Sequence, residues 1–67
     1  MNVRKLETEK NYDDGNDRVW YQVDGISDEL DGVYGVINGA IVEENGLSID
    51  DDMPDNDTIA IRRALNM

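Results

Sequence analysis

The chain contains no cysteine and no histidine. Disulfides are therefore excluded, and so is a tetrahedral zinc site built from sulfur and nitrogen ligands. Catalytic pairs of the Ser–His or Cys–His type are excluded for the same reason. Carboxylates are abundant enough to lie in pairs by chance, so their presence alone does not indicate acid–base catalysis. We expect no cofactor and a protein that is not an enzyme.

Long apolar runs are also missing. No stretch approaches the roughly 20 residues that cross a bilayer, and residues 1–7 lack the apolar core of a signal peptide. We therefore expect no membrane partner and, by default, a cytoplasmic protein. With 67 residues the chain predicts one domain, 1–67, whose core supplies only about 3 to 5 kcal/mol. Self-association into a homodimer, a partner or salt would add stability.

Basic residues are few. The chain has 6 of them against 16 acidic residues, which gives a formal net charge of −10. Such a field repels nucleic acid and anionic membranes and attracts basic protein surfaces. The expected partner is thus a basic protein surface, with no direct nucleic-acid binding. The alternative is that the acidity only keeps the protein soluble.

The N-terminal half is typical of a β-hairpin. Asp13–Asp17 predicts a loop of about five residues between strands at 6–12 and 18–23. In the second strand, alternation places Val19, Tyr21 and Val23 on the face opposite Trp20. In the first, it places four side chains on one face: Leu6, Thr8, Lys10 and Tyr12.

The middle of the chain predicts a meander of three short strands. Ser27 can cap a single helical turn that Gly32 ends. Strands are then expected at 33–37, 40–44 and 47–49. Asn38-Gly39, between the first two, is the dipeptide that a type I′ turn favours, because both of its residues tolerate positive φ.

The C-terminal segment is harder to interpret. Residues 50–57 are acidic and contain the only proline, which predicts an irregular loop. Residues 58–65 fit a helix capped by Asp57, with Ile61 and Leu65 stacked, and they also fit a strand; we favour the helix.

The expected fold is therefore α+β, a small antiparallel sheet of four to five short strands (a β-hairpin plus a meander) with one short C-terminal helix. The predicted core consists of Leu6, Val19, Tyr21, Val23, Ile26, Leu30, Val33, Val36, Ile37, Ile41, Val42, Leu47, Ile49, Ile59, Ile61 and Leu65.

A calcium loop at 50–57 is the sharpest metal hypothesis, and the spacing argues against it. An EF-hand would need a ligand at Pro54, glycine at Asp55 and glutamate at Ile61. We expect a solvated acidic loop there and no metal site.

Spacing gives more support to mimicry of nucleic acid. Glu7 and Glu9 on one strand would project from one face about 6.6 Å apart, a separation similar to that of phosphates along a nucleic-acid strand. An exposed Trp20 could anchor the interface. The candidate partner-binding residues are Glu7, Glu9, Trp20, Asp28, Glu29, Asp31, Glu43, Glu44, Asp50, Asp51, Asp52, Asp55 and Asp57.

Three functional hypotheses follow. The first is a small acidic inhibitor that docks on a basic nucleic-acid-binding protein, such as phages and mobile elements direct against host defence. The second is a small adaptor or assembly component whose acidity is incidental. The third is a domain adapted to high salt, since Lys occurs only twice and Phe not at all.

Overall fold

A computed structural model describes residues 1–67. Its four strands form one antiparallel sheet in the order β1-β2-β3-β4, and two helices follow. The strands are β1 (Asn2–Asp13), β2 (Asn16–Asp24), β3 (Gly32–Ile37) and β4 (Ala40–Glu43). The helices are α1 (Ile49–Asp52) and α2 (Asp55–Ala64). The small α+β fold expected from the sequence is confirmed.

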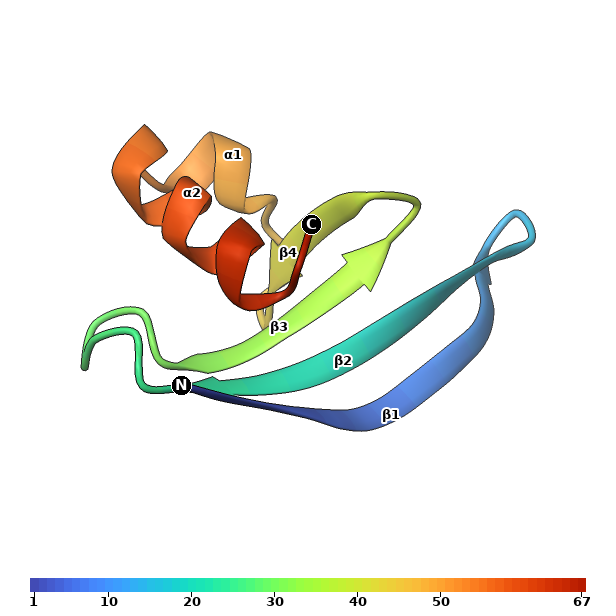
Figure 1. Ribbon diagram of the computed structural model, residues 1–67. Coiled ribbons are helices and arrows are strands. Elements are labelled where there is room, and N and C mark those ends of the chain that lie inside the picture. The colour runs from blue at the N-terminus through green and yellow to red at the C-terminus, as the bar shows by residue number, and fades with distance from the viewer.

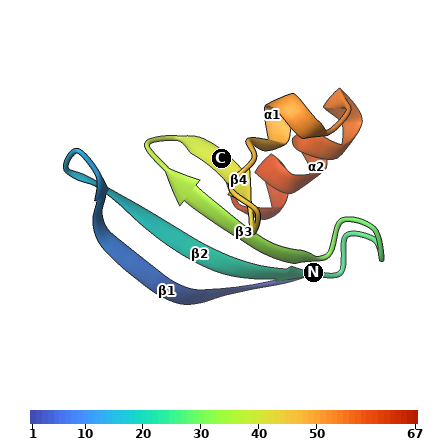
Figure 2. The ribbon, with the colours of Figure 1, turned by 180° about the vertical axis from the view of Figure 1, so that it is seen from behind.

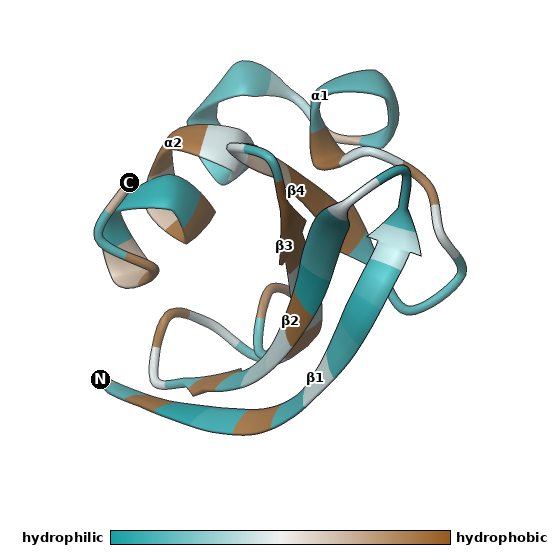
Figure 3. Ribbon diagram, turned by 90° about the vertical axis from the view of Figure 1, so that its right-hand side faces the viewer, coloured by the Kyte–Doolittle hydropathy of each residue, from teal (hydrophilic) through white to brown (hydrophobic).

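The molecule has two layers. Both helices lie on one side of the sheet, over β3 and β4, while β1 lies farthest from them (Figures 1 and 2). The turn between β1 and β2 extends away from the two helices (Figure 1). Colouring by hydropathy shows β3 and β4 as mostly hydrophobic and β1 as mostly hydrophilic (Figure 3). Because both helices lie on the same side of the sheet, its opposite face has no covering layer.

The first hairpin is tighter than predicted. Asp13 pairs with Asn16, so the expected five-residue loop is a two-residue turn at Asp14-Gly15, and both turn residues have positive φ. The strands also extend further than 6–12 and 18–23, although the added Asn and Asp residues at their ends are poor strand formers on average.

Two bulges interrupt β1. Register shifts fall between Lys5 and Thr8 and between Glu9 and Asp13. At the first, Leu6 and Glu7 together lie opposite one residue of β2, so alternation is broken and Leu6 does not share a face with Thr8 as predicted. At the second, the Asp17 carboxylate accepts the backbone N–H of Asn11 at 2.9 Å. That hydrogen bond lowers the pKa of Asp17, with a further contribution from Lys10.

The second hairpin confirms one prediction and corrects another. Ile37 pairs with Ala40 across Asn38-Gly39, whose φ angles are 48° and 79°, as a type I′ turn requires. The third strand of the meander, 47–49, does not form. Only an isolated bridge joins Val42 and Ser48, and Ile49 already begins α1.

A single turn at 27–31 joins the two hairpins. The Ser27 hydroxyl accepts the N–H of Leu30 at 3.3 Å, as expected for a cap. The Asp31 carboxylate accepts the backbone N–H groups of Gly25, Ile26 and Ser27 at 3.1, 2.8 and 3.2 Å. These hydrogen bonds lower the pKa of Asp31 and show that the side chain holds the turn.

The segment 50–57 is not the irregular loop that its composition predicted. α1 covers 49–52, and α2 begins at Asp55 with Pro54, rather than Asp57, as its N-cap. Aspartates in a first helical turn interact favourably with the helix dipole, and this offsets their weak helix propensity. The two helices are joined by an ion pair of 2.7 Å between Arg62 and Asp50. Residues 58–64 are helical, as favoured.

The core lies between α1, α2 and the β3–β4 half of the sheet. Its fully buried side chains are Val23, Ile41, Ile49 and Ile61, with Leu30, Tyr34 and Ala64 nearly buried. Val33 and Val42 were also predicted to be in the core, but they lie outside it, on the opposite face of the sheet with Trp20 and Gly35. Three further predicted core residues, Leu6, Leu47 and Ile59, are 43%, 50% and 47% exposed. They lie on β1, in a loop and on the outer side of α2, where no second layer covers them.

Candidate functional site

The uncovered face of the sheet is organised around Trp20. This residue pairs with Gly35 on β3, and Gly35 pairs with Val42 on β4. A Cβ atom at Gly35 would lie 3.0 Å from the Trp20 ring and 3.0 Å from Val42. The indole thus lies directly on the Gly35 backbone, and glycine is the residue that permits this contact. Trp20 is partly buried rather than fully exposed.

Trp20 belongs to a polar network on this face. Its Nε1–H donates to Glu9 Oε1 at 2.5 Å, and the Arg18 Nε–H donates to the same oxygen at 2.6 Å. The Arg18 guanidinium also stacks 3.5 Å from the Tyr12 ring centroid and 4.8 Å from that of Trp20. The hydrogen bonds from Arg18 and Trp20 lower the pKa of Glu9, and the bond to Glu9 raises the pKa of Arg18.

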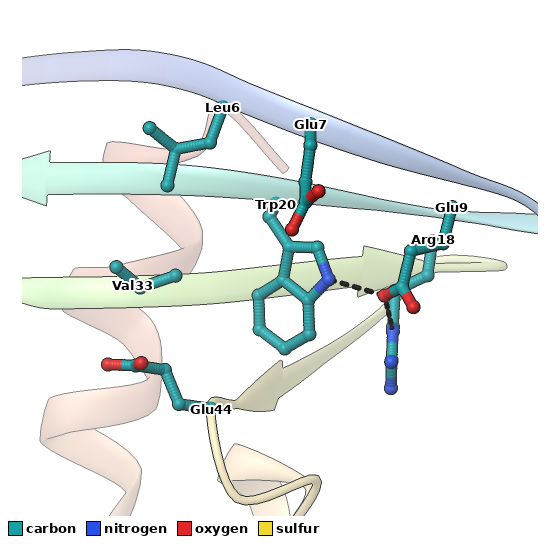
Figure 4. A pocket seen from close by; sticks show the side chains of 7 residues that line it. All are labelled: Leu6, Glu7, Glu9, Arg18, Trp20, Val33 and Glu44. Carbon is teal, nitrogen blue, oxygen red and sulfur yellow. Dashed lines mark hydrogen bonds and ion pairs between the residues drawn. The ribbon is translucent and has the colours of Figure 1, made fainter.

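Beside this network lies a hollow of about 450 Å³, which we call the open-face hollow. It crosses the sheet from Glu7 on β1 to Glu44 just after β4, with Trp20 and Val33 between them (Figure 4). The lining residues are Leu6, Glu7, Glu9, Arg18, Trp20, Val33 and Glu44. The hollow therefore combines an apolar lining with three carboxylates and one guanidinium.

A second, smaller hollow of about 290 Å³ adjoins the first and shares Val33 and Glu44 with it. Glu29, Asp31 and Glu43 contribute carboxylates there. The neighbouring Asp52 carboxyl group raises the pKa of Glu43, and partial burial adds to the effect. One Glu43 carboxylate oxygen is buried and has no hydrogen-bond partner.

A third group of carboxylates lies on the helices. We call it the helix array: Asp50, Asp51, Asp52, Asp55 and Asp57. Four of these residues are exposed and Asp57 is partly buried. Asp50 alone makes an ion pair, with Arg62. The array is thus held at fixed positions on α1 and the first turn of α2, and most of its charge is unpaired.

Charge is distributed unequally along the chain. Residues 1–24 contain six acidic and four basic residues, a net charge of −2, whereas residues 25–67 contain ten and two, a net charge of −8. Two of the basic residues in the first region make ion pairs there, Lys10 with Asp17 and Arg18 with Glu9. The acidic surface is therefore mainly a property of residues 25–67.

The predicted site residues fall into separate groups. Glu7, Glu9, Trp20 and Glu44 are brought together in the open-face hollow, and Glu29, Asp31 and Glu43 line its neighbour. Two of them are already engaged: Glu9 binds Arg18 and Trp20, and Asp31 binds the backbone of its own turn. Asp28 is exposed and lines neither hollow.

Sequence reasoning missed three members of the open-face hollow: Leu6, Arg18 and Val33. Arg18 could have been found, because it lies two residues from Trp20 in a strand and so shares its face. Leu6 could not, since only the bulge turns it toward Trp20.

No three carboxylates come together in a way that could hold a metal ion. Neither helix is long and apolar enough to cross a membrane. In comparisons with known proteins, no family model, no curated protein and no solved structure matches this chain.

Proposed function

We propose that the protein is a non-enzymatic binding module that docks on a basic surface of another protein and inhibits it. In its most specific form it occupies the surface that a nucleic-acid-binding protein uses for DNA or RNA, in the cytoplasm where such a partner works. The observation that supports the proposal is the helix array, in which carboxylates stand at fixed positions on two helices.

Fixed positions matter because a mobile loop must be ordered on binding. Ordering costs about 1 to 2 kcal/mol for each backbone residue that becomes fixed. In this protein the helices and the Asp50–Arg62 ion pair have already ordered the segment. An array of this kind presents charge in a set pattern, as a nucleic-acid backbone does.

The contribution of each carboxylate should be small. Exposed ion pairs contribute roughly 0.2 to 1 kcal/mol, so affinity requires several at once. Long-range attraction from the net charge of −8 in residues 25–67 would speed the encounter, particularly at low salt.

A charge-matched pair of variants tests the proposal. Asp51→Asn with Asp55→Asn removes two charges from the helix array, and Asp13→Asn with Asp24→Asn removes two exposed charges from the β1–β2 hairpin. Association with a basic partner, isolated from a lysate at low salt, should be slowed and made less salt-dependent by the first variant much more than by the second. Equal effects would show that net charge alone is responsible.

One observation favours a second candidate, the adaptor. The uncovered face around Trp20 exposes apolar groups, and Leu6 is 43% exposed. If Trp20→Ala abolished partner binding while the helix-array variant left it unchanged, an adaptor that binds through this face would be the better description.

A further inference from the structure

The open-face hollow has a shape and charge that select one kind of ligand group. We propose, building on the proposed function, that it is a pocket for an arginine side chain of the basic partner. The aliphatic stem would lie along Leu6 and Val33, and the guanidinium would pair with Glu7 next to Trp20, while Glu44 at the other end of the hollow adds attraction for the cation. This contact is separate from the helix array.

The charges in the hollow are not balanced internally. Three carboxylates face one guanidinium, and the Arg18 cation is already matched by Glu9 at 2.6 Å. Glu7 and Glu44 make no ion pair and no hydrogen bond. The hollow therefore retains two unpaired negative charges, at its two ends (Figure 4).

The same hollow offers apolar surface between these charges. Leu6, Val33 and the Trp20 ring line it. The β-bulge places Leu6 and Glu7 side by side opposite Trp20, so that an apolar side chain and a carboxylate both border the hollow at this edge. Long basic side chains bury an aliphatic stem and keep the charged head near polar groups, and this arrangement accommodates both parts.

Arginine fits better than lysine for two reasons. A planar guanidinium stacks on aromatic rings, and Trp20 and Tyr12 already accept Arg18 in this way at 4.8 and 3.5 Å. It also binds carboxylates through two N–H groups at once, whereas an ammonium acts as a point charge.

Fluorescence can report on the hollow directly, because Trp20 is the only tryptophan in the chain. The probe is a capped peptide of alternating arginine and glycine, titrated into the full chain at low salt. Matched peptides carry citrulline, which is neutral and similar in shape, or lysine. We expect a saturable change in Trp20 fluorescence with the arginine peptide, weaker binding of the lysine peptide and no saturation with citrulline.

Two variants of equal charge locate the binding. Glu7→Gln with Glu44→Gln should raise the Kd of the arginine peptide roughly fivefold or more, the effect of losing the exposed ion pair with Glu7 and the attraction of Glu44. Asp51→Asn with Asp55→Asn should change it by less than about twofold. Circular dichroism shows whether each variant remains folded, and since all four positions are exposed we expect both to be folded.

Several results would refute the proposal that the hollow binds arginine. Equal binding of the citrulline or lysine peptide would exclude recognition of arginine. Equal effects of the two double variants would place the peptide elsewhere while leaving the basic partner of the proposed function intact. Conversely, the arginine peptide could bind in the hollow while the protein associates with no basic partner. That result would support the pocket and refute the proposed function. An absence of any peptide binding would refute the pocket.

Discussion

The β1–β2 hairpin and the remainder of the chain are stabilised in different ways. In residues 1–24 only Val23 is buried, and the strands are held by ladder hydrogen bonds, two bulges and the Glu9–Arg18–Trp20 network. Residues 25–67 hold the rest of the core and a net charge of −8, against −2 for the hairpin.

The comparison shows that apolar packing and unfavourable charge are concentrated in the same half of the molecule. Burial in the half formed by residues 25–67 must offset the repulsion among its carboxylates. Repulsion among carboxylates is weaker in the β1–β2 hairpin, because four basic residues offset much of its negative charge. Acidity that serves binding would thus be confined to the region with enough core to tolerate it.

Truncation of a core side chain on α2 should destabilise the protein most. Ile61 is fully buried, and Ile61→Ala should cost about 2 to 5 kcal/mol, which is comparable with the whole stability of a chain this small. Leu6→Ala on β1, at a side chain that is 43% exposed, should cost less than about 1 kcal/mol. Urea unfolding measures both, and similar losses would refute the division between the two regions.

The contact that joins the two regions on the uncovered face is the next target. Gly35→Ala places a methyl group 3.0 Å from Trp20 and Val42 and should cost about 1 to 3 kcal/mol and shift Trp20 fluorescence. Gly32→Ala is the control, because apart from the adjoining residues of the chain no atom lies within 4 Å of its added methyl group. Equal melting temperatures for the two variants would show that Trp20 does not rest on Gly35.

A smaller effect is expected where carboxylates meet in the acidic half. Glu43→Gln removes the charge that lies against Asp52 and should stabilise the protein at neutral pH by roughly 0.2 to 1 kcal/mol. The pKa of Glu43 is raised in the folded state, so its contribution to stability grows as pH falls through that pKa. The pKa values of Glu9, Asp17 and Asp31 are lowered, so their contributions are lost at acidic pH.

Thermal unfolding measured from neutral to acidic pH tests the direction in which Glu43 changes stability. As pH falls from neutrality, the advantage of Glu43→Gln over the unmodified chain should shrink. An advantage that grew on acidification would contradict the raised pKa.

Added salt should change the melting temperature only slightly for each carboxylate whose charge it screens. Screening weakens repulsion among the carboxylates as the Debye length falls from about 30 Å at 0.01 M to 3 Å at 1 M. The melting temperature should therefore rise with salt, and less so for Asp51→Asn with Asp55→Asn than for Asp13→Asn with Asp24→Asn. A flat curve for the unmodified chain would mean that the acidic half is not under electrostatic strain. Unfolding below molar salt would instead favour adaptation to high salt.

Local signals predicted much of the fold. Asn38-Gly39 and the alternation around Trp20 define strands that the structure contains, because turn geometry and the pleat depend on a few neighbouring residues. The bulges in β1 could not be predicted, since they depend on pairing with β2 rather than on any residue of β1 alone. The helix at 49–52 was missed because the burial of Ile49 and the ion pair to Arg62 outweigh the weak helix propensity of three aspartates.

The candidate site was only partly predictable. Charge and exposure identified the helix array and the carboxylates of the open-face hollow. Sequence alone could not reveal that Glu9 and Asp31 already have partners within the protein. Glu9 on β1 contacts Arg18 and Trp20 on β2, and Asp31 accepts hydrogen bonds from the backbone of its own turn.

Competition between nucleic acid and this protein for the isolated basic partner shows whether the two occupy the same surface. DNA or RNA is titrated against the protein while its binding to that partner is followed, with Asp51→Asn plus Asp55→Asn and Asp13→Asn plus Asp24→Asn compared in parallel. We expect nucleic acid to displace the protein, and to displace the helix-array variant at lower concentration than the hairpin variant. Simultaneous binding of nucleic acid and protein, with no loss of affinity for either, would contradict the proposal that the protein occupies a nucleic-acid surface.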